Sequence, residues 1–217
     1  LGKLVKWMGE QLSAAGVEVL TTFPAQEVLL DGDRVTGVQV GDKGVNPDGA
    51  PKGVFEPGPH LMAKATVFCE GSRGSCAKKL IQRLNLQGHN PQVYATGVKE
   101  VWEFDRSPLP EGHVIHTMGY PMDSRTFGGG FIYAMTHNQV ALGVVTGLDY
   151  HDPNLDPHRQ FCKFKQHPLV AKLLAGGRLI SYGAKTLPEG GYFSVPRLAV
   201  DGALICGDSA GLIALPK

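Results

Sequence analysis

The sequence has 217 residues, of which 42% are apolar and 19% charged, a balance typical of folded rather than disordered proteins. Its formal charge of +1 gives no reason to expect a nucleic-acid partner, and no apolar run reaches the roughly 18 residues of a membrane-spanning helix. The 29 glycines and 15 prolines favour short strands and many turns.

The first 60 residues predict a helix followed by paired strands. Apolar residues recur on one helical face over 1–15, and Gly16 sits where a glycine cap ends a helix. Because the chain opens on Leu1 inside this pattern, we expect a fragment of a longer protein. The expected strands are 17–20 and a hairpin of 25–30 with 34–40 around Asp31-Gly32, before a long loop or loosely paired hairpin over 41–59.

The next stretch is typical of a nucleotide-binding α/β layer. Residues 65–69 form a short apolar run that predicts a strand buried on both faces. The polar, glycine-rich turn "EGSRGS" follows, and then an amphipathic helix in "CAKKLIQRL". A buried strand, a glycine-rich turn and a helix in this order can hold a nucleotide cofactor.

The middle of the chain reads as consecutive strands. We expect them in "YATGVKEVWEF", "HVIHTMGY", "GGFIYAM" and "QVALGVVTGL", the last two joined by a turn at 136–138. Neighbouring strands of this kind predict an antiparallel sheet inserted into the nucleotide-binding layer. Asp156 as N-cap and Pro157 at the first position predict a helix, which is interrupted at His167-Pro168. A last long strand, "RLISYGAKTL", follows.

Three consecutive glycines, Gly128 to Gly130, occupy what should be a strand interior. Glycine weakens a strand, so the run indicates a bend, a bulge or a place where something approaches the backbone closely. The residues alone favour a bulge that bends the sheet.

A second glycine-rich turn, "GDSAG", follows the apolar strand "ALIC" near the end of the chain. Asp208 could accept a hydrogen bond from a sugar hydroxyl, and the small residues after it let a phosphate reach backbone amides. An ordinary strand-to-loop turn with a solvated aspartate is the alternative. The similar turn at 70–75 favours the cofactor interpretation.

The cysteines and histidines predict no metal site within this chain. The four cysteines form no C-x-x-C pair, and Cys69 and Cys206 lie in strand-like apolar runs, where cysteine acts as a small hydrophobe. This cysteine use suits a reducing compartment. His113 and His116 would point to opposite faces of a strand. We find no nucleophile–base arrangement and therefore predict no catalytic residue.

Segments from end to end of the chain resemble the electron transfer flavoprotein–ubiquinone oxidoreductases. They include "WMGEQLSAAGVEV", "NPDGAPKGVFEPGPHLMAKATVFCEGSRG", "GVKEVWEF", "FGGGFIYAM", "VVTGLDYHDPNLDPHRQFCKFKQHPLV", "GGRLISYGAKTLPEGGYFSVPRL" and "GDSAG". The resemblance implies a peripheral membrane flavoenzyme that takes electrons from electron transfer flavoprotein and passes them through FAD and a four-iron four-sulfur cluster to ubiquinone. It also implies that the glycine-rich motif for the ADP half of FAD precedes Leu1 and that the cluster ligands follow Lys217.

The resemblance assigns site residues as well. In the family, backbone groups at the position of Gly128 and Gly129 hold the ubiquinone head group, and Phe127 would wall the pocket. Without Cβ atoms, a planar ring can approach main-chain N–H groups there. The resemblance implies five FAD contacts, namely Glu70, Gly71, Gly207, Asp208 and Gly211.

The fold class expected is therefore α+β, a partial FAD-binding α/β layer plus an antiparallel ubiquinone-binding sheet with flanking helices. Residues 1–90 belong to the FAD-binding part, with an insertion at 25–60; residues 91–190 form the sheet domain, with helices near 156–175; and residues 191–217 return to the FAD-binding part.

Two alternatives to this function remain open. One is a geranylgeranyl-reductase-like FAD enzyme that acts on an isoprenoid. The other is a fragment with no activity of its own, which is the expectation for this chain in isolation. The parent protein would lie on an inner membrane, at the cytoplasmic face in a bacterium or the matrix face in a mitochondrion.

Overall fold

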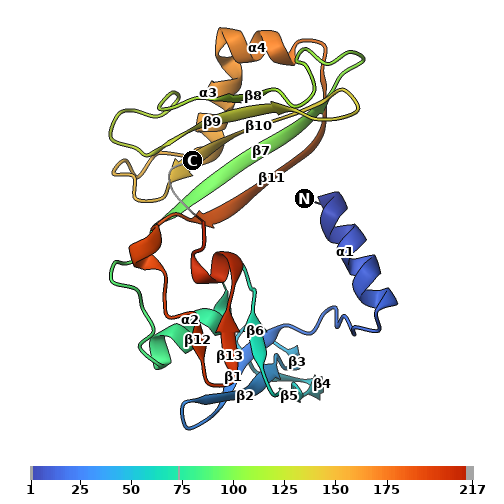
Figure 1. Cartoon of the computed structure of the whole chain (residues 1–217), viewed down its shortest axis with the longest axis vertical. Helices are drawn as coiled ribbons and strands as arrows, with labels where there is room; N and C mark the ends of the chain where they lie inside the picture. Colours follow the sequence, from blue (N-terminus) through green and yellow to red (C-terminus); the bar gives the residue numbers. More distant parts are fainter. Residues whose placement is uncertain (1, 73, 214–217) are drawn as a thin grey trace. The chain divides into compact units, whose positions relative to one another are not determined.

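The computed structural model describes residues 2–72 and 74–213 (Figure 1). Contacts divide the chain into two compact units: one runs to Thr66 and includes Val200–Leu204, and the other takes Val67–Ala199 and the segment from Ile205 onward. The predicted division near residues 90 and 190 stays a prediction. The α+β fold class is confirmed, with an antiparallel sheet as its largest element.

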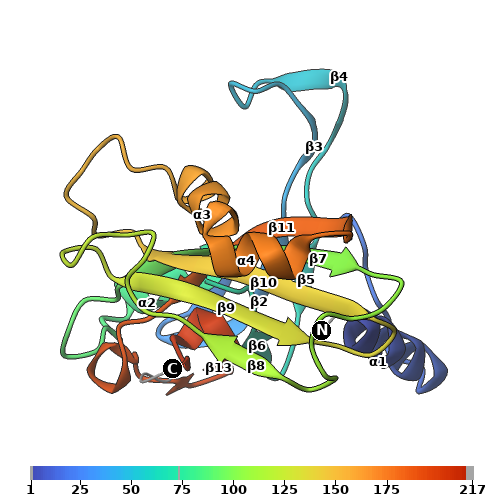
Figure 2. The same cartoon turned by 90° about the horizontal axis from the view of Figure 1, so that it is seen from above.

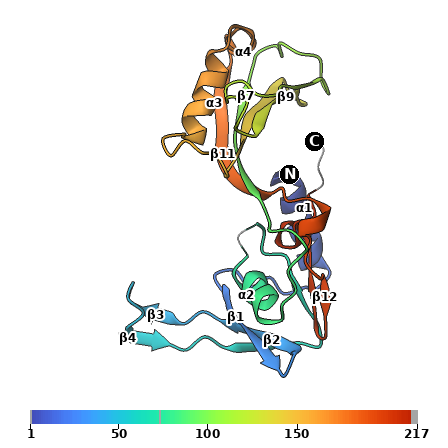
Figure 3. The same cartoon turned by 90° about the vertical axis from the view of Figure 1, so that its left-hand side faces the viewer.

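The first unit contains a helix and two hairpins. Its elements are α1 (Gly2–Ala14), β1 (Ala25–Asp31), β2 (Arg34–Val40), β3 (Lys43–Val45), β4 (Pro51–Glu56) and β5 (His60–Met62). Strand β2 pairs with β1 on one side and β5 on the other, while β3 and β4 form a separate hairpin that extends away from β1 and β2 (Figure 3). The sequence left open whether 41–59 is a long loop or a loosely paired hairpin, and the structure shows a hairpin.

The first unit corrects two details of the sequence prediction. Residues 17–20 form no strand, and Val17, Val19 and Leu20 are 43–57% exposed, since no neighbouring strand among the described residues pairs with them. The β1–β2 turn lies at Gly32-Asp33, one residue later than expected, because Asp31 still pairs with Arg34.

Three short strands, β6 (Thr66–Phe68), β12 (Ala199–Val200) and β13 (Ala203–Ile205), form a sheet in the order β12-β13-β6. Strand β6 is buried on one face only, since Phe68 is 3% exposed and Val67 is 53% exposed. The expectation of a strand buried on both faces is therefore wrong. Helix α2 (Ser75–Arg83) follows β6, as predicted.

The second unit is built on a five-stranded antiparallel sheet in the order β11-β7-β10-β9-β8. Its strands are β7 (Tyr94–Glu103), β8 (Val114–His116), β9 (Gly128–Ala134), β10 (Gln139–Gly147) and β11 (Arg178–Pro188). Figure 2 shows α3 (Pro157–Gln166) and α4 (Pro168–Leu174) over one face of this sheet. The remaining turns include two 3-10 helices, η1 (Tyr192–Ser194) and η2 (Gly207–Ala210).

The core of this unit lies between the sheet and α3. Phe161 and Phe164 of α3 pack with Ile132, Leu142 and Val144 of the sheet, and all five are at most 2% exposed. Asp156 caps α3 as predicted, since its side chain accepts hydrogen bonds from the backbone N–H groups of His158 (2.8 Å) and Arg159 (3.3 Å).

Candidate functional site

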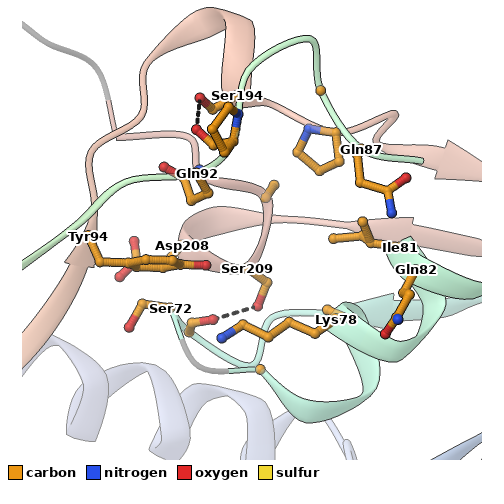
Figure 4. A pocket seen from close by; sticks show the side chains of 18 of the residues that line it. Ser72, Lys78, Ile81, Gln82, Gln87, Gln92, Tyr94, Ser194, Asp208 and Ser209 are labelled. Carbon is orange, nitrogen blue, oxygen red and sulfur yellow. Dashed lines mark hydrogen bonds between the residues drawn. The ribbon is translucent and has the colours of Figure 1, made fainter. Parts of the chain in front are cut away.

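The second unit contains two hollows that include sequence-predicted site residues. The first, here called the turn cavity, has a volume of about 390 Å³. It lies between the turn after β6, the turn after β13, helix α2 and the segment leading into β7 (Figure 4). Three of the five predicted FAD contacts line it, namely Gly71, Asp208 and Gly211.

Backbone conformation and hydrogen bonding hold the two turns of this cavity together. Gly71, Gly207 and Gly211 adopt φ values of 77°, 61° and 69°, a region in which a side chain is strained. The Ser209 hydroxyl donates a hydrogen bond to the Gly71 carbonyl at 3.0 Å, as drawn in Figure 4. The Ser72 hydroxyl donates to the Thr186 carbonyl at 2.8 Å and ties the first turn to β11.

Glu70 does not line the turn cavity. Its carboxylate accepts hydrogen bonds from the backbone N–H groups of Cys76 (3.1 Å) and Ala77 (2.6 Å) at the start of α2. These N–H groups have no partner inside the helix, and a carboxylate there also meets the positive end of the helix dipole. Glu70 thus stabilises α2, and its role toward a ligand stays a prediction. Gly207 also lies outside the residues that line the cavity.

Several polar residues of the turn cavity were not singled out from the sequence. Lys78 extends from α2 toward Ser72 and Ser209 in Figure 4, and its ammonium nitrogen lies 5.3 Å from the centre of the Tyr94 ring. Gln92 Oε1 accepts hydrogen bonds from the backbone N–H groups of Gly190 (2.6 Å) and Val93 (3.1 Å). The amphipathic pattern of α2 indicates which of its residues are polar, but not that Lys78 meets the two distant turns.

The second hollow, here called the sheet cavity, has a volume of about 180 Å³. All three residues predicted to contact ubiquinone, Phe127, Gly128 and Gly129, line it. The other residues around it come from the end of β8, from β9 and β10, and from the segment after β11; they are His116, Thr117, Met118, Gly130, Phe131, Val145 and Glu189.

The three glycines are the first three residues of β9, and they pair with β10 without a register shift, so the expected bulge is absent from this pairing. A Cβ atom on Gly128 would lie 2.3 Å from the Val145 carbonyl oxygen, and one on Gly129 would lie 2.2 Å from the Thr117 carbonyl oxygen. A Cβ on Gly130 would lie 2.5 Å from the Phe164 ring. At each of the three positions, therefore, it is a neighbouring part of the protein that comes too close for any residue but glycine.

Thr117, the residue after β8, is hydrogen-bonded to β9 beside the sheet cavity. Thr117 exchanges backbone hydrogen bonds with Gly130, at 2.8 Å for its N–H and 3.1 Å for its carbonyl, and the Thr117 hydroxyl accepts a second bond from the Gly130 N–H at 2.9 Å. Since side chains alternate along a strand and Gly130 faces α3, Gly129 and Phe131 face the side of the sheet away from α3.

Aromatic rings form a flat surface on that side. Phe131 and Tyr133 stack with their ring centres 5.8 Å apart and their planes inclined by 21°. The Phe131 ring lies over Gly143, where a Cβ would be 2.5 Å from the ring carbon Cζ. Phe127 is 54% exposed at the rim. A narrow, mainly apolar slot beside aromatic rings suits a planar apolar ligand, and His116 brings a hydrogen-bonding ring to its edge.

The turn that precedes the glycines is ordered by Asp123. Its carboxylate accepts hydrogen bonds from the Thr126 hydroxyl and the Arg125 backbone N–H, both at 3.0 Å. The Thr126 hydroxyl, followed by the Arg125 N–H, holds the pKa of Asp123 below its usual value. This turn fixes the direction in which the chain enters Phe127 and β9.

No group of three or more His, Cys, Asp or Glu residues in the described part of the chain is placed to hold a metal ion. Over the same residues, no helix is both long and apolar enough to cross a membrane.

A family model and whole-chain relatives both match this chain, and both are named for ubiquinone. The family model described as "ETF-QO, ubiquinone-binding" matches residues 94–187. Over its whole length the chain is 46% identical to the mitochondrial electron transfer flavoprotein-ubiquinone oxidoreductase of Homo sapiens and 43% identical to that of Arabidopsis thaliana. It spans 36% and 35% of these proteins, or about a third of their length. The predicted resemblance is thus confirmed along the whole chain.

Solved structures with a similar fold include flavin-dependent enzymes. A geranylgeranyl bacteriochlorophyll reductase-like protein from Thermoplasma acidophilum matches with a TM-score of 0.71 at 14% identity, over 97% of this chain and 47% of that one. A triple mutant of the flavin-dependent brominase Bmp2 matches with a TM-score of 0.62 at 15% identity, over 96% of this chain and 48% of that one. At these identities the likeness concerns the fold alone, and it agrees with a partial FAD-type fold.

Proposed function

We propose that the sheet cavity binds the head group of ubiquinone, within a flavoenzyme that passes electrons from electron transfer flavoprotein through FAD to ubiquinone. One observation carries the proposal: Phe127, Gly128 and Gly129 converge on one cavity, inside the segment 94–187 that matches a ubiquinone-binding family. The aromatic and aliphatic residues of the cavity supply contacts for a quinone ring, and the backbone of β9 and the His116 ring supply polar groups.

The turn cavity is the proposed place for part of FAD. The small residues Gly71 and Gly211 allow close approach of a ligand, Asp208 could accept from its sugar-like hydroxyls, and Lys78 could meet its phosphates. Bound FAD would supply the electrons, while these residues bind and orient it. The residues present fit part of the cofactor.

The remaining parts of the proposed function concern the parent protein. A four-iron four-sulfur cluster would be ligated outside this chain, electron transfer flavoprotein would be the electron donor, and attachment to the inner membrane would be peripheral. The related proteins with 43–46% identity are named mitochondrial, which favours the matrix face over a bacterial cytoplasmic face. In isolation, we expect these 217 residues to bind quinone without turnover.

The geranylgeranyl-reductase-like alternative has weaker support. The Thermoplasma acidophilum protein shares the fold at 14% identity, whereas the relatives at 43–46% identity are named ubiquinone oxidoreductases. An affinity of the sheet cavity for an isoprenoid tail without a quinone ring would favour this alternative.

A calorimetric titration of the 217-residue chain with a short-tailed ubiquinone tests the proposal. Phe127→Ala removes a rim ring that is 54% exposed, so little stability should be lost, but quinone affinity should fall roughly tenfold with the loss of an aromatic contact. Phe193→Ala is the matched control, because Phe193 is 61% exposed and lies outside the sheet cavity. Equal affinities of both variants and the unsubstituted chain, or no binding by the folded chain, would contradict the proposal.

A further inference from the structure

Two cysteines lie side by side at the ends of neighbouring strands. Strand β6 ends at Phe68 and β13 ends at Ile205, so Cys69 and Cys206 are the next residue on each. The two strands are adjacent in their sheet (Figure 1). The backbone N–H of Cys206 donates a hydrogen bond to the Phe68 carbonyl at 3.0 Å. The Thr66 N–H also donates to the Gly202 carbonyl at 2.9 Å, and in the parallel ladder that these two bonds define, Ile205 lies opposite Phe68 and Cys206 opposite Cys69.

Both thiols point to the same side of the sheet. Phe68 and Ile205 are 3% and 2% exposed on the buried face, whereas Val67 and Leu204 are 53% and 46% exposed on the other. Since side chains alternate along a strand, Cys69 and Cys206 share the face of Val67 and Leu204. Neighbouring strands lie about 4.8 Å apart, which falls within the Cα separation that a disulfide can span.

The environment of the thiols differs from the sequence expectation of two buried apolar cysteines. Cys69 is exposed and Cys206 is half-buried, and all four cysteines are thiols. Partial burial and the neighbouring Cys206 thiol raise the pKa of Cys69. A raised pKa lowers the thiolate fraction of Cys69 at neutral pH, so its reaction with a disulfide is slower than that of an ordinary exposed thiol.

We propose that Cys69 and Cys206 form a redox-modification site, a thiol pair that closes to an intramolecular disulfide on reaction with a low-molecular-weight disulfide such as glutathione disulfide. The exposed Cys69 loses its proton and attacks one glutathione sulfur, the glutathione S–S bond breaks, and one glutathione thiol leaves with that proton. Cys206 then loses its proton and attacks the Cys69 sulfur, and the second glutathione thiol leaves. Two protein thiols are oxidised and one glutathione disulfide is reduced to two thiols.

The position of the pair gives the modification a structural consequence. Cys69 precedes the turn that contains Gly71, and Cys206 precedes the turn that contains Asp208, and both turns line the turn cavity. The Ser209–Gly71 hydrogen bond joins these two turns in Figure 4, and the disulfide would add a covalent link between the residues that precede them. In a reducing compartment such a bond is transient and therefore suited to regulation. The inference holds whichever ligand the turn cavity takes.

Peptide mapping under oxidising conditions tests this proposal on the intact 217-residue chain. The folded chain is equilibrated with glutathione disulfide and glutathione in varied ratio, remaining thiols are alkylated, and the unreduced digest is analysed by mass spectrometry. We expect a peptide pair joined through Cys69 and Cys206, with the intact mass lower by two hydrogen atoms. Cys162, which is half-buried and 3.6 Å from His158, is an internal comparison that should not join either of them.

Single-cysteine variants separate the pair from the reactivity of each thiol. In Cys206→Ser, Cys69 should accumulate as a mixed disulfide with glutathione, because no second thiol can displace it. Cys162→Ser should still form the internal disulfide. Separate glutathione adducts on Cys69 and Cys206 in the unsubstituted chain, both thiols recovered unmodified under the most oxidising ratio, or a bond to a different cysteine would overturn the proposal.

Discussion

At the scale of single residues, the glycine run of β9 meets three different neighbours. Gly128 lies against the Val145 backbone, Gly129 against the Thr117 backbone and Gly130 against the Phe164 ring. Protein interiors are close-packed, so one added methyl group lowers the stability wherever its neighbours cannot move. The backbone atoms beside Gly128 and Gly129 can shift away from an added methyl group less easily than the Phe164 ring beside Gly130. The run therefore serves the packing of the sheet as well as any ligand.

Replacement of Gly130 by alanine should destabilise the second unit. Its Cβ would lie 2.5 and 2.6 Å from two carbons of the buried Phe164 ring, and overpacking of this kind typically costs about 1–3 kcal/mol. The measurement is urea unfolding followed by Trp102 fluorescence, in a Trp7→Phe background so that the sheet alone is observed.

Gly183→Ala is the matched control for this substitution. Gly183 also lies in a strand of the same sheet, but a Cβ built there meets nothing within 4 Å. Alanine restricts the unfolded backbone more than glycine does, so the stability of this variant should be unchanged or higher by about 0.5–1 kcal/mol. If both variants lose the same stability, the packing explanation for the glycine run is wrong.

The candidate site was partly predictable at this scale. Phe127, Gly128 and Gly129 were expected together, and all three line the sheet cavity. The hydrogen bonds of the Glu70 carboxylate to the start of α2 were not expected, because nothing in "EGSRGS" tells which way this side chain turns. Lys78 lines the same cavity as the two turns because of the tertiary structure, which no local pattern encodes.

At the scale of elements, local signals were reliable where capping residues or turns define an element. The α3 cap at Asp156, the first-turn Pro157 and the hairpin of β1 and β2 were all expected and observed. Local signals failed at residues 17–20, whose apolar character predicted a strand. A strand is stable only with a partner, and the sequence of the segment alone does not reveal one.

Loss of the α3 cap should weaken the packing of the helix on the sheet. Asp156→Ala leaves the N–H groups of His158 and Arg159 without their acceptor, at a cost of about 1 kcal/mol. Asp156→Asn keeps an acceptor oxygen and should remain close to the unsubstituted chain. Amide hydrogen exchange in α3 and urea unfolding measure the effect, and an asparagine variant as unstable as the alanine variant would refute the capping role.

At the scale of the whole molecule, the strand order depends on contacts between distant parts of the chain. Strand β11 follows two helices and returns to pair with β7, giving the order β11-β7-β10-β9-β8. Consecutive strands predicted an antiparallel sheet, but the pattern within β11 does not tell which strand of the sheet it joins. The α+β class was therefore predictable, whereas the sheet order and the two cavities were not.

The central claim is that the sheet cavity binds ubiquinone, and backbone-amide NMR of the labelled 217-residue chain during titration with a short-tailed ubiquinone tests it most directly. We predict saturable shifts that are largest at Gly128, Gly129 and their cavity neighbours His116, Thr117 and Met118. The amides of α1, which lies in the other unit, should not move. Shifts centred on any other surface, or a folded chain whose spectrum does not change, would contradict the claim.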